Sequence, residues 1–249
     1  MVLTMKTSSK NASLLWAGTI AVLLLVVISG NSVSTFSVYA DSGYVGSNTQ
    51  TAKSCSGKPS QNTDWSNCDL HGVDLSFLNL SGINLSGANL QGANLYGTNL
   101  SGANLVGAQL AGASVNSVVL SGAKLDGITA QNMDFYHATL VGADFQGANL
   151  QGSAFGSVNF QNANFTGANL SGIRAITSSF TNVNLSKADL SNANLRASDL
   201  TGANLSDTNL QYADISYAIL AGADLTGANV SGLATAGTDR SCHGSPICH

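Results

Sequence analysis

The sequence predicts an all-β protein whose chain winds into a square, parallel β-solenoid. Three observations support this prediction: an apolar residue recurs at every fifth position, a small residue stands two positions before it, and a polar residue and often a glycine follow it. The stretch SGANLQGANLYGTNLSGANL, residues 86–105, shows all three. A period of five fits neither the 3.6-residue turn of a helix nor the two-residue alternation of a strand.

The register of the repeat is unbroken over most of the chain. From Leu70 to Val230 every residue number divisible by five is a repeat centre; of these 33 centres, 22 are Leu and six are Phe. The centre and the small residue before it point to one side of a short extended piece, and the two residues after the centre can turn the chain. If each unit turns by a right angle, four units close a 20-residue coil. About eight coils would then stack to about 40 Å at ~4.8 Å per coil.

A 20-residue coil requires that residues 20 apart in the sequence stack on one another. The six Phe centres fall into three such pairs, as favourable aromatic ladders would require: Phe135 with Phe155, Phe145 with Phe165, and Phe160 with Phe180. The two Ala centres, Ala130 and Ala175, each have an Ile two positions earlier. The large and small positions are exchanged there, which roughly conserves the core volume.

The pattern A(N/D)LxG resembles the pentapeptide-repeat family. The segments AGADLTGANV (221–230) and FQNANFTGANL (160–170) match the motif directly, and the resemblance covers about two thirds of the chain. It implies a right-handed quadrilateral parallel β-helix of about eight coils. Some members of this family resemble a DNA duplex and bind DNA gyrase. This chain departs from them in its weak acidic charge and in the absence of an obvious C-terminal helix for dimerisation.

Residues 1–40 have the features of a cleavable signal peptide. Lys6 and Lys10 give a positive start, the apolar run LLWAGTIAVLLLVVI spans residues 14–28, and the sequence VYA at 38–40 is a small-x-small cleavage site. The run has 15 residues, whereas a membrane span needs about 20. We therefore expect a secreted or extracytoplasmic protein. The alternative is an uncleaved anchor, with membrane contact through residues 14–28 only.

A stack of coils has two open ends, and both need a cover. Residues 41–67 are the predicted N-terminal cap, residues 68–232 the solenoid, and residues 233–249 the C-terminal cap. Such a division places the irregular sequence at the two ends of the repeat.

The four cysteines lie in or beside these caps. An exported protein can keep disulfides, and the simplest pairing is local, with one bond at each end, although four cysteines allow three connectivities. The candidates are Cys55, Cys68, Cys242 and Cys248. In the tail, Cys242, His243, Cys248 and His249 could alternatively bind a metal ion, but their spacing matches no common structural zinc pattern. We expect disulfides and no metal.

Composition and spacing argue against catalysis and against nucleic-acid binding. The chain has no Glu, and the two His of the repeat region, His71 and His137, fall on different columns of the square. Asp134 and Asp214 share a column but lie four coils apart, about 19 Å, too far for a pair of catalytic carboxylates. Without residues 1–40 the formal charge is −6, from seven Lys and Arg and 13 Asp, whereas a nucleic-acid surface should be basic. We predict no enzymatic activity and no cofactor.

One corner of the predicted square differs from the polar remainder. We call it the aromatic edge: the two turn residues after Leu75 and after every twentieth residue from it, namely 76–77, 96–97, 116–117, 136–137, 156–157, 176–177, 196–197 and 216–217. Aromatic and Arg side chains are the ones that binding surfaces favour. The candidate binding residues on or beside this edge are Phe77, Tyr96, Tyr136, His137, Arg174, Arg196, Tyr212 and Tyr217.

The sequence therefore favours a non-enzymatic, exported structural or interaction scaffold that presents a rigid surface to a protein or cell-envelope partner. Two alternatives stay open. One is a DNA-mimicking protein that binds a topoisomerase such as gyrase. The other is a surface for a glycan or a regular lattice, for which Thr166, Ser186, Ser206 and Thr226 form part of one ladder. The sequence does not decide the oligomeric state.

Overall fold

The computed structural model describes residues 3–7, 10–15, 22–29, 32–39, 55 and 59–248. The chain divides into two compact units, Met1–Tyr44 and Val45–His249. The first unit contains an antiparallel sheet in the order β1-β2-β3-β4, formed by β1 (Leu3–Thr7), β2 (Lys10–Leu15), β3 (Val22–Ser29) and β4 (Ser32–Tyr39). The described part of the apolar run at 14–28 thus lies in β2 and β3. None of the described helices is long and apolar enough to span a membrane.

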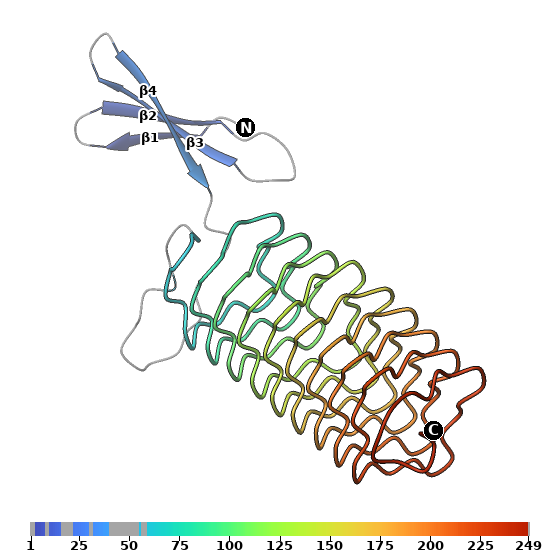
Figure 1. Ribbon diagram of the computed structural model, residues 1–249. Coiled ribbons are helices and arrows are strands. Elements are labelled where there is room, and N and C mark those ends of the chain that lie inside the picture. The colour runs from blue at the N-terminus through green and yellow to red at the C-terminus, as the bar shows by residue number, and fades with distance from the viewer. Residues whose placement is uncertain are drawn as a thin grey trace. The chain divides into compact units, whose positions relative to one another are not determined.

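The second unit is a right-handed parallel β-solenoid in which residue i pairs with residue i + 20 (Figure 1). The first parallel bridge joins Asp64 to Asn84. The last joins Asp224 to His243, which are 19 residues apart, so the final coil is one residue shorter than the others. The backbone ladder therefore extends beyond the predicted limits of 68 and 232 at both ends. The solenoid has about nine coils rather than about eight, because parts of both predicted caps already follow the coil.

Most five-residue units make the same backbone hydrogen bonds. The amide of Leu70 donates to the carbonyl of Asn89 in the next coil at 2.8 Å, and the amide of Asn89 donates back to the carbonyl of Cys68 at 2.9 Å. Between these rungs the chain turns, with the amide of Val73 donating to the carbonyl of Leu70 at 3.2 Å. Extended pieces of three residues and turns of two thus alternate, which gives the period of five.

The interior is filled by the centres and by the small residues two positions before them. Every centre from Leu70 to Leu225 is buried. The predicted Phe pairs are confirmed: rings 20 residues apart are stacked, with centroids 4.8 Å apart in Phe135–Phe155 and Phe145–Phe165 and 4.7 Å apart in Phe160–Phe180. At the Ala centres Ile128 and Ile173 are buried beside Ala130 and Ala175, so the exchange of large and small residues is also confirmed.

The Asn or Asp before each centre holds the turn and the neighbouring coil together. The side-chain oxygen of Asn84 accepts the amide of Ser86 at 3.2 Å, and its side-chain nitrogen donates to Asp64 in the preceding coil at 3.0 Å. The same pair of contacts recurs at Asn99, Asn164 and Asn209. This explains why an amide or carboxylate is the most frequent choice at this position.

Ser replaces the small residue at two positions where the turn of the preceding coil lacks its own hydrogen bond. Ser153 Oγ accepts the amide of Met133 at 3.1 Å and donates to the carbonyl of Ala130 at 2.9 Å. Ser178 bridges Val158 and Phe155 in the same way, at 3.2 and 2.6 Å. Both hydroxyls are buried, so each one satisfies a buried donor and a buried acceptor that would otherwise be unpaired.

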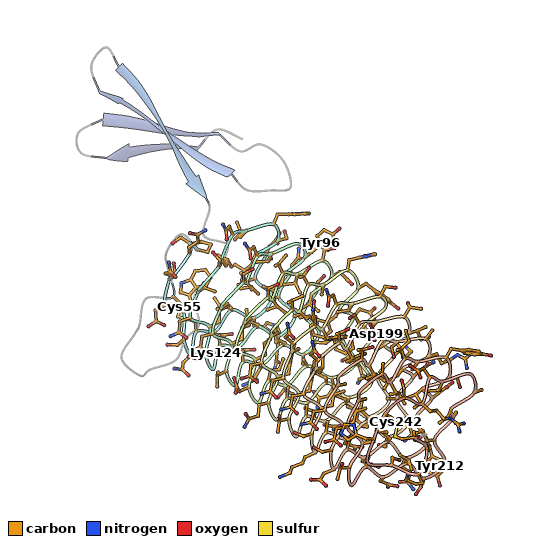
Figure 2. The ribbon with its side chains drawn as sticks, in the orientation of Figure 1. Cys55, Tyr96, Lys124, Asp199, Tyr212 and Cys242 are labelled. Atoms are coloured by element: carbon orange, nitrogen blue, oxygen red, sulfur yellow. A yellow bond between two sulfur atoms is a disulfide. The ribbon has the colours of Figure 1, made fainter. Side chains whose placement is uncertain are left out.

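The two ends are covered by different groups. At the N-terminal end Trp65 occupies a centre position and is buried, and Cys55 forms a disulfide with Cys68. At the C-terminal end Arg240 Nη2 donates to Thr235 Oγ1 at 3.1 Å, and Cys242 forms a disulfide with Cys248. The two bonds have the predicted local connectivity, and Figure 2 shows Cys55 and Cys242 at opposite ends of the stack of coils.

We predict that Ser153→Ala lowers the free energy of unfolding by about 1–3 kcal/mol, because it leaves the amide of Met133 and the carbonyl of Ala130 buried and unpaired. Denaturant unfolding followed by circular dichroism measures the change. The matched control is Ser171→Ala, since Ser171 is more exposed and its hydroxyl bonds only to Asn169 of its own turn. Equal losses in the two variants would contradict the bridging role.

Candidate interaction edge

The aromatic edge collects most of the exposed apolar side chains of the described solenoid. Five of its residues are exposed, with exposed fractions from 42% to 74%: Phe77, Tyr96, Tyr136, Ile176 and Tyr217. Tyr212 lies on the neighbouring corner and Ile219 on the adjoining ladder, and both are exposed. The remaining large exposed apolar residue, Val106, lies on the opposite corner. The apolar surface is therefore concentrated along one of the four corners.

Several edge residues adopt a backbone conformation that suits glycine. At the second turn position the chain has a positive φ, and most units place Gly or Asn there. Phe77, His137 and Tyr217 of the edge occupy this position with φ between 58° and 63°, and so does Tyr212 on the neighbouring corner. Such a φ is unfavourable for bulky side chains, at a cost of about 1–2 kcal/mol each. The fold alone does not account for aromatic residues at these positions.

The rings of the edge pack against glycines of the next coil. A Cβ atom on Gly97 would lie 2.9 Å from the ring of Phe77, and one on Gly237 would lie 2.6 Å from the ring of Tyr217. Gly156 and Gly232 are covered in the same way by Tyr136 and Tyr212. Phe77 also contacts Tyr96, with ring centroids 5.2 Å apart in an edge-to-face arrangement. Because these positions carry no side chain, each exposed ring packs directly against the backbone of the next coil, which restricts its orientation.

At its C-terminal half the edge carries positive charge. Arg196 Nη1 donates to Asp214 Oδ2 at 3.1 Å, and its guanidinium carbon lies 5.4 Å from the ring centroid of Tyr217. Arg174 is exposed on the ladder beside the edge, two rungs before Asp214. Figure 2 shows Tyr96 toward the N-terminal end of the stack and Tyr212 toward the C-terminal end.

The structure brings seven of the eight predicted residues onto the edge or the ladder directly beside it; Tyr212 lies one corner away. Sequence reasoning placed Ile176 on the edge but did not name it as a candidate, and it missed Ile219. The signal for Ile219 was available, because it replaces the Asn or Asp that normally precedes a centre, as in Asp199 and Asp239 on the same ladder.

Other parts of the described chain offer no comparable site. Among the described residues no group of three or more His, Cys, Asp or Glu side chains could hold a metal ion; His249, which was part of the alternative metal set, lies outside them. A hollow at the C-terminal end is lined by Thr235 and residues 237–241. It lies on the last coil and includes Gly237, which continues the column of the aromatic edge beyond Tyr217.

Several carboxylates of the ladders are stabilised in their charged form. A hydrogen bond from the Ser76 hydroxyl lowers the pKa of Asp74, one from Thr201 lowers the pKa of Asp199, and one from Thr226 lowers the pKa of Asp224. In Asp214 desolvation opposes the shift, but the hydrogen bonds from Ser216 and Arg196 still lower its pKa. These Asp side chains therefore contribute to folding as anions.

Fold and edge together define a class of protein, a β-solenoid repeat protein with a polar body and one apolar corner. The family model for pentapeptide repeats matches the chain in eight copies, over residues 61–87, 79–116, 116–152, 159–196 and 188–227. The chain belongs to the pentapeptide-repeat family. A search of the curated proteins found no match.

Three solved structures illustrate the similarity. HetL, a pentapeptide-repeat protein involved in heterocyst differentiation regulation in the cyanobacterium Nostoc, is 28% identical; the alignment covers 76% of this chain and 94% of HetL, with a TM-score of 0.34. A pentapeptide-repeat protein of the Arabidopsis thaliana thylakoid lumen is 30% identical over 38% of this chain and 66% of its own, with a TM-score of 0.37. QnrB1, a plasmid-mediated fluoroquinolone resistance protein, is 18% identical over 72% and 87%, with a TM-score of 0.45.

We predict that the stability of the protein falls with pH in the acid range. Because the folded-state pKa values of Asp74, Asp199 and Asp224 lie below their ordinary values, their contribution is present above about pH 4 and is lost as the pH falls through the folded values. Denaturant unfolding at pH values from 7 to 2 measures it. In the double variant Ser76→Ala, Thr226→Ala this dependence should be smaller, and an unchanged profile would contradict the assignment.

Proposed function

We propose that this protein is an exported, non-enzymatic interaction scaffold whose aromatic edge binds a protein partner in the extracytoplasmic space. Pentapeptide-repeat proteins are in general structural or interaction proteins. The observation that carries the proposal is the concentration of exposed apolar residues on one corner of an otherwise polar solenoid. Exposed apolar residues on this corner do not contribute to the core, and apolar patches on a protein surface mark contact sites.

The backbone of the edge supports the same proposal. Phe77, Tyr212 and Tyr217 stand in a conformation that Gly or Asn adopts at lower cost, and their rings are still largely exposed. Strain that the fold does not require is a marker of function. The rings are also seated on glycines, so little side-chain entropy would be lost when a partner covers them.

The duplex-mimic alternative receives less support from the distribution of charge. A mimic of a duplex needs dense negative charge along its surface. The described Asp residues of the ladders are spread over all four of them, with Asp64, Asp144 and Asp224 on one, and Asp74, Asp134 and Asp214 on another. Arg174 interrupts the second of these ladders, and Arg196 on the corner beside it pairs with Asp214.

The lattice alternative depends on a row of free hydroxyl groups. In the predicted row of Thr166, Ser186, Ser206 and Thr226, three hydroxyls donate to the Asn or Asp two residues earlier at 2.6–2.7 Å, namely those of Thr166, Ser206 and Thr226. Their protons are therefore committed to the turns of the protein itself. This favours a protein partner on the aromatic edge over a lattice on the hydroxyl ladder.

We predict that the triple variant Tyr96→Ser, Tyr136→Ser, Tyr217→Ser loses the partner. The tagged full chain is expressed in its native host, and proteins that co-purify with it are identified by mass spectrometry. The control variant Val106→Ser, Asp126→Ser, Gln146→Ser changes the opposite corner and should retain the partner, and circular dichroism verifies that both variants fold. A partner retained by the edge variant would overturn the role of the edge.

Export makes a separate prediction. The protein recovered from the native host should lack residues 1–40 and should gain about 4 Da on reduction, because two disulfides become four thiols. Intact-mass measurement before and after reduction decides this. A full-length, fully reduced chain in the soluble fraction would reject export and would return the topoisomerase alternative to first place.

A further inference from the structure

We propose that the partner of the aromatic edge is a second copy of this chain, bound edge to edge and antiparallel about a two-fold axis through the coil of Ala154 and Gly156. The inference rests on the proposed function, since it takes the edge to be an interaction surface. It goes further by naming the occupant and the register of the contact.

The first argument is the placement of two unpaired charges. Asp134, Ala154 and Arg174 are consecutive rungs of the ladder beside the edge. Asp134 and Arg174 are exposed, and in the part of the chain that the structure describes neither has an ion-pair partner. They stand two coils apart, about 10 Å, with buried Ala154 between them, so they do not neutralise each other within one chain.

The second argument is that the apolar residues of the edge follow the same symmetry. Tyr136 and Ile176 are both exposed and lie one coil before and one coil after Gly156. The ring of Tyr136 covers this glycine, because a Cβ atom there would lie 2.7 Å from Tyr136 Cε1. The central coil therefore presents only the small residues Ala154 and Gly156 at this place. The coil before it carries an apolar side chain and a negative charge, and the coil after it carries an apolar side chain and a positive charge.

A two-fold axis across the edge converts this pattern into a complementary contact. In an isologous dimer the same ladder of both copies meets in opposite directions, so that a residue n coils before the axis faces one n coils after it. Asp134 of each copy then faces Arg174 of the other, and Tyr136 faces Ile176. Farther from the axis Tyr96 faces Ser216, which lies next to Tyr217, and Asn116 faces Arg196.

The size of the contact sets the expected strength. The edge is one corner wide and about 40 Å long, which is narrow compared with the interfaces of permanent dimers. We therefore expect a weak dimer with a Kd of about 10–100 µM, which weakens further at high salt because two of its contacts are exposed ion pairs.

Charge reversal provides the test, by sedimentation velocity of the purified full chain from about 1 to 500 µM. The wild type should form dimers, whereas Asp134→Arg and Arg174→Asp should each be monomeric, because like charges then meet at both ion-pair positions. An equimolar mixture of these two variants should form a heterodimer, since each reversed residue faces its opposite. The double variant Asp134→Arg, Arg174→Asp should dimerise as the wild type does.

A cross-link tests the register. Ser157 is exposed in the axial coil, so Ser157→Cys should form a disulfide with its own copy under mild oxidation. Ser117→Cys occupies the same turn position two coils away and should not. A chain that is monomeric at every concentration, or dimers that neither single reversal weakens, would overturn the proposal.

The outcome is separable from that of the proposed function. If co-purification recovers a different protein through the edge and the purified chain is monomeric, the scaffold proposal stands and the second copy is rejected. If the purified chain dimerises as predicted and the edge retrieves only untagged copies of the chain, both stand. If edge variants retain every partner while the charge-reversed mixture dimerises, the dimer stands without the proposed partner function.

Discussion

The structure depends on one constraint: four units of five residues must bring the chain back to the same side of the square, one coil further along, so that its backbone pairs with the coil before. Because residue i pairs with residue i + 20 in the bridges from Asp64 to Asp239, the amides and carbonyls of neighbouring coils stay aligned there only if no unit gains or loses a residue. A single insertion would move the centres out of the core and the polar residues into it, as a slip of register does in any sheet. The unbroken register from Leu70 to Val230 is the sequence record of this constraint.

The same constraint turns the surface into columns. A side chain at a turn position is repeated on the next coil about 4.8 Å away, so a property that recurs every 20 residues becomes a stripe along the molecule. At this spacing an Asn side chain can donate a hydrogen bond to the side chain of the neighbouring coil, as Asn84 does to Asp64. The aromatic edge uses it differently, with rings that lean over glycines of the following coil, as in Tyr217 over Gly237.

The fold could be predicted from the sequence because one period determines it. The Phe pairs follow from a 20-residue coil, the exchanged Ala and Ile positions from a conserved core volume, and the local disulfides from the position of the cysteines at the two ends of the repeat. The limits of the solenoid could not be predicted as well. Thr235 and Arg240 continue the coil without an apolar residue at the centre, and at the other end the centre is Trp65 rather than Leu or Phe. The sequence pattern therefore ends before the backbone ladder does. The bridges made by Ser153 and Ser178 could not be predicted either, because Ser in place of Ala keeps the small size that the repeat needs. Ile219 lies on an extended piece of the chain, whereas the pattern of the aromatic edge involves the turn positions only.

The two disulfides lie where a linear array is weakest. An inner coil is held by a neighbour on each side, whereas the first and last coils have one neighbour only, so unfolding of such an array starts at its ends and advances coil by coil. Cys55–Cys68 and Cys242–Cys248 close short loops at these two starting points. Their effect is therefore larger than that of two local cross-links: by preventing the terminal coils from opening, they delay the loss of every coil behind them.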